Sequence, residues 1–203
     1  MIRQWTLLIL LMISVWTGAA QAATDATALP ADSVYRSALT LRDQAERLFT
    51  PASLRGHPVI VSMIYASCPE ACPLTIDAIK QIRAAVKSRT GHAAPQVVLV
   101  SFDPVHDTVQ ALAGMASVHQ LPYPVWRLAR PEQGDVRAFA ATLGVSYRMR
   151  PNGDFSHNIE IVLLDADGRI VASTSKLGTP DPDFVDRVSR ISAHTAAASP
   201  RLP

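Results

Sequence analysis

Apolar and polar positions follow two different periods in the first half of the chain. Val59–Tyr65 and Val97–Phe102 are continuous apolar runs of strand length, rich in β-branched residues, which is typical of buried strands. Between them, Pro73–Arg89 carries isoleucine or valine every three or four residues, with charged residues in between. This is the period of an amphipathic helix. The pattern therefore predicts a strand, a helix and a second strand in this order.

Helical and extended segments continue to alternate in the second half. We first expect a helix with Val109, Leu112 and Met115 on one face, capped by Asp107 or Thr108, and then an extended stretch over Pro122–Leu128. A helix from Pro131 to Leu143 and an alternating strand over Ile159–Leu163 follow. The last predicted elements are a hairpin turn at Asp167-Gly168 that leads into Arg169–Ala172, and a helix over Phe184–Ile191. This order predicts an α/β fold with a central mixed sheet flanked by helices. It is the element order of a thioredoxin-like fold.

The first 23 residues have the pattern of an export signal. Arg3 supplies a positive charge, an apolar core follows, and small residues precede a cleavage point near Ala23. An uncleaved membrane anchor remains the alternative. We therefore predict a signal peptide over residues 1–23, a spacer over 24–40, a thioredoxin-like domain over 41–195 and a flexible tail over 196–203. The predicted location is the bacterial periplasm, with membrane association if the signal is kept.

Composition and charge exclude several classes of protein. The 203 residues include 19 Lys and Arg against 17 Asp and Glu, a net charge of +2 without a dense basic run. This argues against a nucleic-acid-binding surface. Two cysteines are too few for a disulfide-rich scaffold or a four-cysteine zinc site. Any chemistry of these cysteines is therefore that of one pair.

The two cysteines lie where the first long helix is expected to begin, in the stretch Cys68–Pro73 (CPEACP). A structural disulfide is the simplest interpretation in an exported protein. A ring this small, however, removes only about 2 kcal/mol of unfolded-chain entropy. A helix N-terminus favours thiolate over thiol and lowers a cysteine pKa. The position therefore favours a reactive pair over an inert one.

A reactive pair leaves two chemistries open. A thioredoxin-type redox motif normally has two residues between its cysteines, whereas Cys68 and Cys72 have three. We expect this spacing to place both sulfurs on one face of a helical turn. Two soft thiolates suit Cu(I), and no second cysteine pair is present to complete a zinc site.

Three stretches of the chain resemble one known family. Tyr65–Thr75 is similar to the Cys-Pro-x-x-Cys-Pro signature of the Sco/SenC proteins, and Ser101–Thr108 is similar to that family's Ser-x-Asp-Pro-x-x-Asp-Thr stretch. Leu143–Val145, then His157 and then Val162–Gly168 resemble the region in which family members carry a metal-binding histidine. The three matches occur in the family's order and together span residues 58–171.

The resemblance implies a thioredoxin-fold copper chaperone for cytochrome c oxidase. It implies that Cys68, Cys72 and His157 bind a copper ion, Cu(I) or Cu(II). The implied partners are the copper subunit of the oxidase and another periplasmic copper chaperone or thiol reductant. Family members often carry Asp before the histidine, whereas this chain has Ser156, so a carboxylate that could tune the imidazole is absent here.

A second function uses the same two cysteines. In a thiol–disulfide oxidoreductase, Cys68 would attack a disulfide of a periplasmic acceptor protein and Cys72 would resolve the mixed disulfide. A copper site needs His157, whereas dithiol exchange does not. A peroxidase is the weaker third option because no Thr-x-x-Cys pattern ends at Cys68. For His106, between Asp103 and Asp107, turn formation and helix capping by the aspartates are favoured over metal binding.

Overall fold

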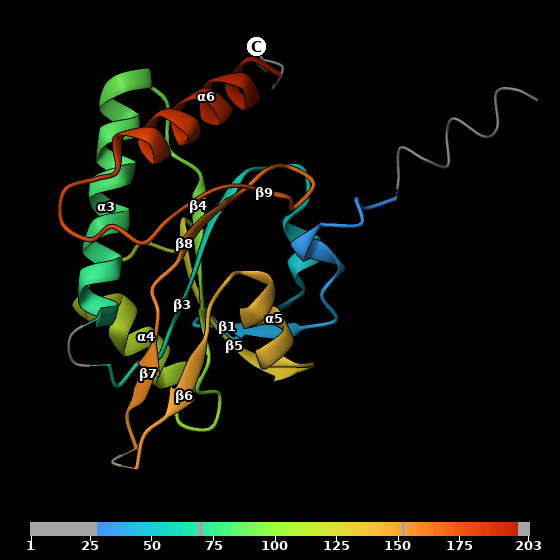
Figure 1. Ribbon diagram of the computed structural model, residues 1–203, viewed down its shortest axis with the longest axis vertical. Helices are drawn as coiled ribbons and strands as arrows, with labels where there is room; N and C mark the ends of the chain where they lie inside the picture. Colours follow the sequence, from blue (N-terminus) through green and yellow to red (C-terminus); the bar gives the residue numbers. More distant parts are fainter. Residues whose placement is uncertain (1–27, 69–70, 152, 199–203) are drawn as a thin grey trace, which may run out of the picture. The chain divides into compact units, whose positions relative to one another are not determined.

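The computed structural model describes residues 28–68, 71–151 and 153–198, which form a sheet with helices packed on it (Figure 1). The helices and 3-10 turns are η1 (Val34–Arg36), η2 (Pro51–Leu54), α3 (Ala71–Thr90), α4 (Val109–Val118), α5 (Val136–Thr142) and α6 (Pro182–Ala198). The strands are β1 (Thr40–Asp43), β2 (Leu48–Phe49), β3 (Val59–Ile64), β4 (Gln96–Ser101), β5 (Trp126–Gln133), β6 (Tyr147–Met149), β7 (Phe155–His157), β8 (Ile161–Leu164) and β9 (Ile170–Thr174).

The main sheet has the strand order β2-β1-β5-β4-β3-β8-β9. Strands β3, β4 and β5 are parallel to one another, while β1, β8 and β9 each pair antiparallel with a neighbour. Every residue of β3 and of β8 is buried, as expected of strands covered on both faces. The predicted α/β class with a central mixed sheet is therefore confirmed.

The longest helix, α3, forms where the apolar period predicts it. Ile76, Ile79, Ile82 and Val86 are at most 1% exposed, and α3 packs against α6, as Figure 1 shows. The next helix, α4, begins after Thr108, whose side-chain oxygen accepts the N–H of Ala111. Thr108 rather than Asp107 is therefore the cap of α4.

The helix predicted from Pro131 is wrong at its beginning. Strand β5 continues to Gln133, and α5 begins only at Val136, where the Asp135 side chain accepts backbone N–H groups of the first turn. The cause is pairing with β1, since Pro131 lies opposite Leu41 in this antiparallel ladder. The missing N–H of proline is tolerated because β1 shifts register at this point.

The spacer predicted over residues 24–40 includes part of the packed domain. Val34, Tyr35 and Leu39 are each 1% exposed. The N–H of Val34 donates to the carbonyl of Gly168 at 2.8 Å, which joins η1 to the β8–β9 turn. The domain therefore begins before residue 41, because this segment packs against η2 and the β8–β9 turn and buries its apolar side chains there.

The ends of the chain lie partly outside the described residues. The predicted signal peptide, residues 1–23, falls entirely in the undescribed part, and so do residues 199–203 of the predicted tail. Helix α6 continues to Ala198, so the tail predicted from residue 196 begins as helix. Within the described ranges, no helix combines the length and the apolar character needed to cross a membrane.

Candidate functional site

The two cysteines lie at the junction between β3 and α3. Cys68 precedes α3 and Cys72 is the second residue of α3. The N–H of Cys72 donates to the Cys68 sulfur at 3.3 Å, and the two cysteines are not joined by a disulfide in this structure. The Cys68 sulfur thus accepts a hydrogen bond from the residue four positions further along the chain, in the first described turn of α3.

The structure also corrects the expected effect of the helix on Cys72. A hydrogen bond with Cys68, together with burial, raises the pKa of the Cys72 thiol well above its usual value. Cys72 is 1% exposed, whereas Cys68 is 8% exposed. The N–H of Cys72 therefore acts on the Cys68 sulfur, while the side chain of Cys72 is held as a buried thiol whose raised pKa keeps it protonated.

Aromatic side chains form the wall between the cysteines and His157. The Tyr65 ring lies 5.2 Å from the rings of both Phe102 and Phe155 and 6.1 Å from the His157 ring, between centroids. Burial and a hydrogen bond with Cys68 raise the pKa of Tyr65 to about 12. Tyr65 therefore connects the side chain of Cys68 with that of His157, a role that local sequence patterns do not reveal.

His157 and Cys68 line the same pocket. It has a volume of about 350 Å³, and its lining also includes Tyr65, Arg150 and Asp154. His157 ends β7, pairs with Tyr147 of β6 and is half-buried. This hairpin was not predicted because its two strands are only three residues long. The structure thus places the imidazole beside the pocket of the Cys68 thiol.

The orientation of the His157 ring indicates which nitrogen can bind a ligand. The ring Nδ1 lies 2.9 Å from the carbonyl oxygen of Asn158. A carbonyl oxygen can only accept a hydrogen bond, so Nδ1 is the donor in this contact and Nε2 is the nitrogen left to bind a ligand. A second hydrogen bond of this type is the usual way in which proteins orient a metal-binding imidazole.

Asp107 holds the loop that leads to Cys68. Its buried carboxylate accepts the N–H of Ala66 at 2.9 Å and the hydroxyl of Ser101 at 2.5 Å. His106 lies beside it with Nδ1 2.8 Å from an Asp103 carboxylate oxygen and most of its ring exposed. The aspartates thus stabilise the turn, as predicted. The hydrogen bond between Asp107 and Ala66 joins residues that are 41 positions apart in the chain, so the spacing of residues in the sequence could not predict it.

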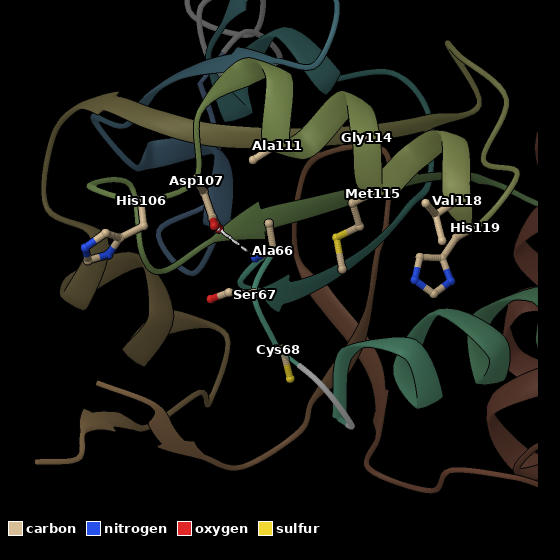
Figure 2. Close-up of a pocket in the computed structure, with 10 residues that line it drawn as sticks. All are labelled: Ala66, Ser67, Cys68, His106, Asp107, Ala111, Gly114, Met115, Val118 and His119. Carbon is tan, nitrogen blue, oxygen red and sulfur yellow. Dashed lines mark hydrogen bonds between the residues drawn. The ribbon is translucent and has the colours of Figure 1, made fainter. Parts of the chain in front are cut away.

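A second pocket borders Cys68 on the side of α4. Figure 2 shows Cys68 and Ser67 below the helix, with Met115 directed from α4 into the space between. The pocket has a volume of about 410 Å³. The dashed line in Figure 2 marks the hydrogen bond between Asp107 and Ala66, both of which line this pocket. Cys68 is therefore reached from two sides, one polar and one mostly apolar.

The predicted copper ligands are only partly assembled. Cys68 and Cys72 are joined by a hydrogen bond, and Cys68 shares a pocket with His157. Across the residues that the structure describes, no three His, Cys, Asp or Glu side chains are gathered closely enough to hold a metal ion. The arrangement supplies two soft sulfur donors and one imidazole on neighbouring elements.

Solved structures of similar shape confirm the predicted thioredoxin-like class. Arabidopsis thaliana ScoI with copper bound has a TM-score of 0.63 and 18% identity, covering 80% of this chain and 99% of that one. Yeast Sco1 with copper bound has a TM-score of 0.61 and 20% identity, covering 80% and 93%. BsSco, a member of the Sco family of cytochrome c oxidase assembly proteins, has a TM-score of 0.61 and 18% identity, covering 77% and 90%.

Relatives by sequence point to the same family. A Stutzerimonas stutzeri protein is 26% identical over 136 residues, 65% of each chain. The mitochondrial SCO2 homolog of Bos taurus is 26% identical over 146 residues, 70% of this chain and 54% of the relative. This chain thus spans less than two thirds of the length of either curated relative.

The family model described as SCO1/SenC matches residues 28–192, well over half of the chain. The resemblance of the cysteine motif is therefore confirmed, and the chain belongs to the SCO1/SenC family.

Proposed function

We propose that the chain is a periplasmic copper chaperone that delivers copper to, or prepares the copper site of, cytochrome c oxidase. The observation that carries this proposal is the pocket shared by the Cys68 thiol and the His157 imidazole, with Cys72 hydrogen-bonded behind Cys68. The copper bound in the structures of Arabidopsis ScoI and yeast Sco1 supports the same assignment. So does the description of BsSco as an assembly protein.

The donor groups suit a cargo that is bound and then released. Two thiolates satisfy Cu(I), which prefers sulfur and a low coordination number, and the Nε2 of His157 adds the nitrogen donor that Cu(II) prefers. Each thiol must lose its proton to bind. A hydrogen bond with Cys68 and burial raise the pKa of the Cys72 thiol, so Cys72 carries a proton before copper binds. Copper binding displaces this proton into solvent. We propose that transfer to the oxidase subunit proceeds by stepwise exchange of these ligands for those of the acceptor.

The source of the copper and the export route complete the proposal. A second periplasmic copper chaperone supplies the ion, and a thiol reductant keeps Cys68 and Cys72 reduced beforehand. Residues 1–23 direct export, and the segment anchors the protein to the membrane if it is not removed. The intact mass of periplasmic protein tests this assignment: loss of the first 22 or 23 residues supports a cleaved signal, and a retained Met1 contradicts it.

Anaerobic copper titration of the reduced protein tests the chaperone function. We expect one copper ion per chain, with sulfur-to-copper charge-transfer bands in the Cu(II) form. Cys68→Ser and Cys72→Ser should each abolish tight binding, because one thiolate and one imidazole leave the ion under-coordinated. Near-wild-type affinity in either single variant would contradict a two-thiolate site, and no binding by the reduced wild type would reject the function.

A thiol–disulfide oxidoreductase is the second candidate, and the unequal burial of the two thiols favours it. Cys68, the more exposed thiol, would attack an acceptor disulfide, and the buried Cys72 would then displace the acceptor's second sulfur. The products are a Cys68–Cys72 disulfide and an acceptor dithiol, a transfer of two electrons and two protons. The response of His157→Ala, described in the Discussion, separates this candidate from the chaperone.

A further inference from the structure

The Cys68 side chain lies between two pockets, and its rotamer decides which of them the sulfur faces. Cys68 lines both the pocket of His157 and the pocket on the side of α4. A cysteine side chain has a single χ1 angle with three staggered positions, so rotation about one bond can carry the sulfur from one side to the other. Figure 2 shows the sulfur directed away from α4. The contacts that hold it there therefore decide whether it can share a ligand with His157.

Tyr65 contacts both sulfurs from the side of His157. The buried Tyr65 lines the pocket of His157, whereas its neighbour Ala66 lines the pocket on the side of α4. The hydroxyl of Tyr65 is hydrogen-bonded to the Cys68 side chain, and its backbone N–H is hydrogen-bonded to the Cys72 side chain. One residue thus acts on the two sulfurs through two different groups, of which only the hydroxyl can be removed without changing the backbone.

The Tyr65 hydroxyl is itself anchored to the strand that carries His157. The backbone N–H of Phe155, the first residue of β7, is hydrogen-bonded to this hydroxyl. Phe155 and His157 are two positions apart on the strand, so their side chains point to the same face. Both rings contact the Tyr65 ring, at 5.2 Å and 6.1 Å between centroids. The hydroxyl therefore links the Cys68 sulfur to the strand that positions the imidazole.

We propose that Tyr65 is a positioning residue whose hydroxyl holds the Cys68 sulfur on the side of His157, so that one copper ion can contact both. The role of the ion rests on the proposed function, whereas the orientation of the sulfur does not. A thiolate only accepts hydrogen bonds, so the hydroxyl is the donor once Cys68 has lost its proton. A hydrogen bond to an ionised acceptor is stronger than one between neutral groups, so the contact is kept when Cys68 becomes a copper ligand.

The rotamer of Cys68 in the reduced, copper-free protein tests the orientation directly. Tyr65→Phe removes the hydroxyl and keeps the ring. Three-bond couplings between Hα and Hβ of Cys68, measured by NMR, report its χ1 angle. We expect a single rotamer in the wild type and an average over several rotamers in Tyr65→Phe. Averaged couplings in the wild type, or the same single rotamer in the variant, would overturn the proposal.

The matched control is Tyr147→Phe. The Tyr147 ring stacks on Phe102 at 4.9 Å and lies 6.1 Å from Phe155, between centroids, so this variant removes a hydroxyl from the same aromatic cluster. It should keep the wild-type couplings of Cys68. An equal change of the couplings in this control would assign the effect to the packing of the cluster and would also overturn the proposal.

Copper affinity tests the consequence for binding. Cu(II) prefers nitrogen donors, whereas two thiolates satisfy Cu(I). In Tyr65→Phe we expect the Cu(II) affinity to fall about tenfold, which corresponds to the loss of one hydrogen bond to a charged group, and the Cu(I) affinity to change less than about twofold. An equal loss of affinity for both ions, or an unchanged Cu(II) affinity, would contradict the positioning role.

The spectrum of the Cu(II) form gives a readout that a merely structural role would not move. A hydrogen bond lowers the energy of the sulfur lone pair, so the sulfur-to-copper charge-transfer band should shift to longer wavelength in Tyr65→Phe and stay in place in Tyr147→Phe. An unshifted band in Tyr65→Phe would show that the hydroxyl does not act on the bound sulfur. Failure of the reduced wild type to bind copper would reject the proposed function instead, and the couplings of Cys68 would still decide whether the hydroxyl holds the sulfur.

Discussion

At the scale of single residues, His157 distinguishes the two candidate functions. His157→Ala removes the nitrogen donor but neither thiol, so Cu(II) binding should weaken far more than Cu(I) binding. Disulfide reduction by the thiol pair should persist. Because the ring packs on Tyr65 and Phe102, we expect a loss of about 1 kcal/mol in the free energy of unfolding, more than for a loop residue. Cu(II) affinity, peptide disulfide reduction and urea unfolding are measured on the same variant.

The control for this variant is His106→Ala, since His106 lies near Cys68 with its ring mostly exposed. It should bind Cu(II) as the wild type does. In cells, loss of oxidase assembly together with Cu(II) binding in His157→Ala supports the chaperone. Retained assembly supports the oxidoreductase, and unchanged Cu(II) affinity would show that His157 is not a ligand.

At the scale of elements, Asp107 fixes the connection between β3 and α3. Asp107→Ala leaves the N–H of Ala66 and the hydroxyl of Ser101 without their buried acceptor. Each unsatisfied group costs about 1–3 kcal/mol, so we expect a loss of about 3 kcal/mol in unfolding free energy. The Cys68 loop should also become more mobile, and alkylation of Cys68 by iodoacetamide should become faster. Thr108→Ala, which removes only the helix cap, should lower stability by about 1 kcal/mol without changing alkylation.

The β8–β9 turn depends on one glycine. Gly168 has a φ of +81°, and a Cβ atom there would lie 2.4 Å from Cγ of Tyr35. Gly168→Ala combines backbone strain with this clash, and we expect it to lower the unfolding free energy by about 2–4 kcal/mol. Gly178→Ala is the matched control, since its φ is +83° but no atom lies within 4 Å of the added carbon. Its cost should be about 1 kcal/mol, and equal urea midpoints for the two variants would contradict the packing role of Gly168.

At the scale of the whole molecule, the segment before β1 is part of the domain. A chain that begins at Thr40 lacks Val34, Tyr35 and Leu39, which are buried against the rest of the domain. Each such side chain contributes about 1.5–3 kcal/mol, and domains are stable by only about 5–15 kcal/mol. The shortened chain should therefore lose about 5 kcal/mol or more, or fail to fold. A chain that begins at Ala31 should match one that begins at Thr24 in its urea midpoint, and full stability of the Thr40 variant would restore the spacer interpretation.

The elements that sequence predicted well are those whose signal is local. Strands β3 and β4 and helix α3 have long runs of one period, so neighbouring residues alone identify them. The short strands β1, β6 and β7 carry no such signal. Strand β1 is determined by its pairing with β5, far along the chain, and β6 and β7 have only three residues each and pair with one another. The same reason explains the error at Pro131, where the ladder with β1 extends β5 beyond the point at which a helix was expected.

The sequence by itself determined the class of the fold, the family, and the position of both cysteines at the beginning of a helix. These properties depend on order and spacing along the chain, which a sequence states directly. Only the tertiary structure decided that His157 shares a pocket with Cys68 and that Asp107 holds Ala66. Contacts between residues far apart in the chain depend on how the sheet and hairpin pack, and no local period encodes that arrangement.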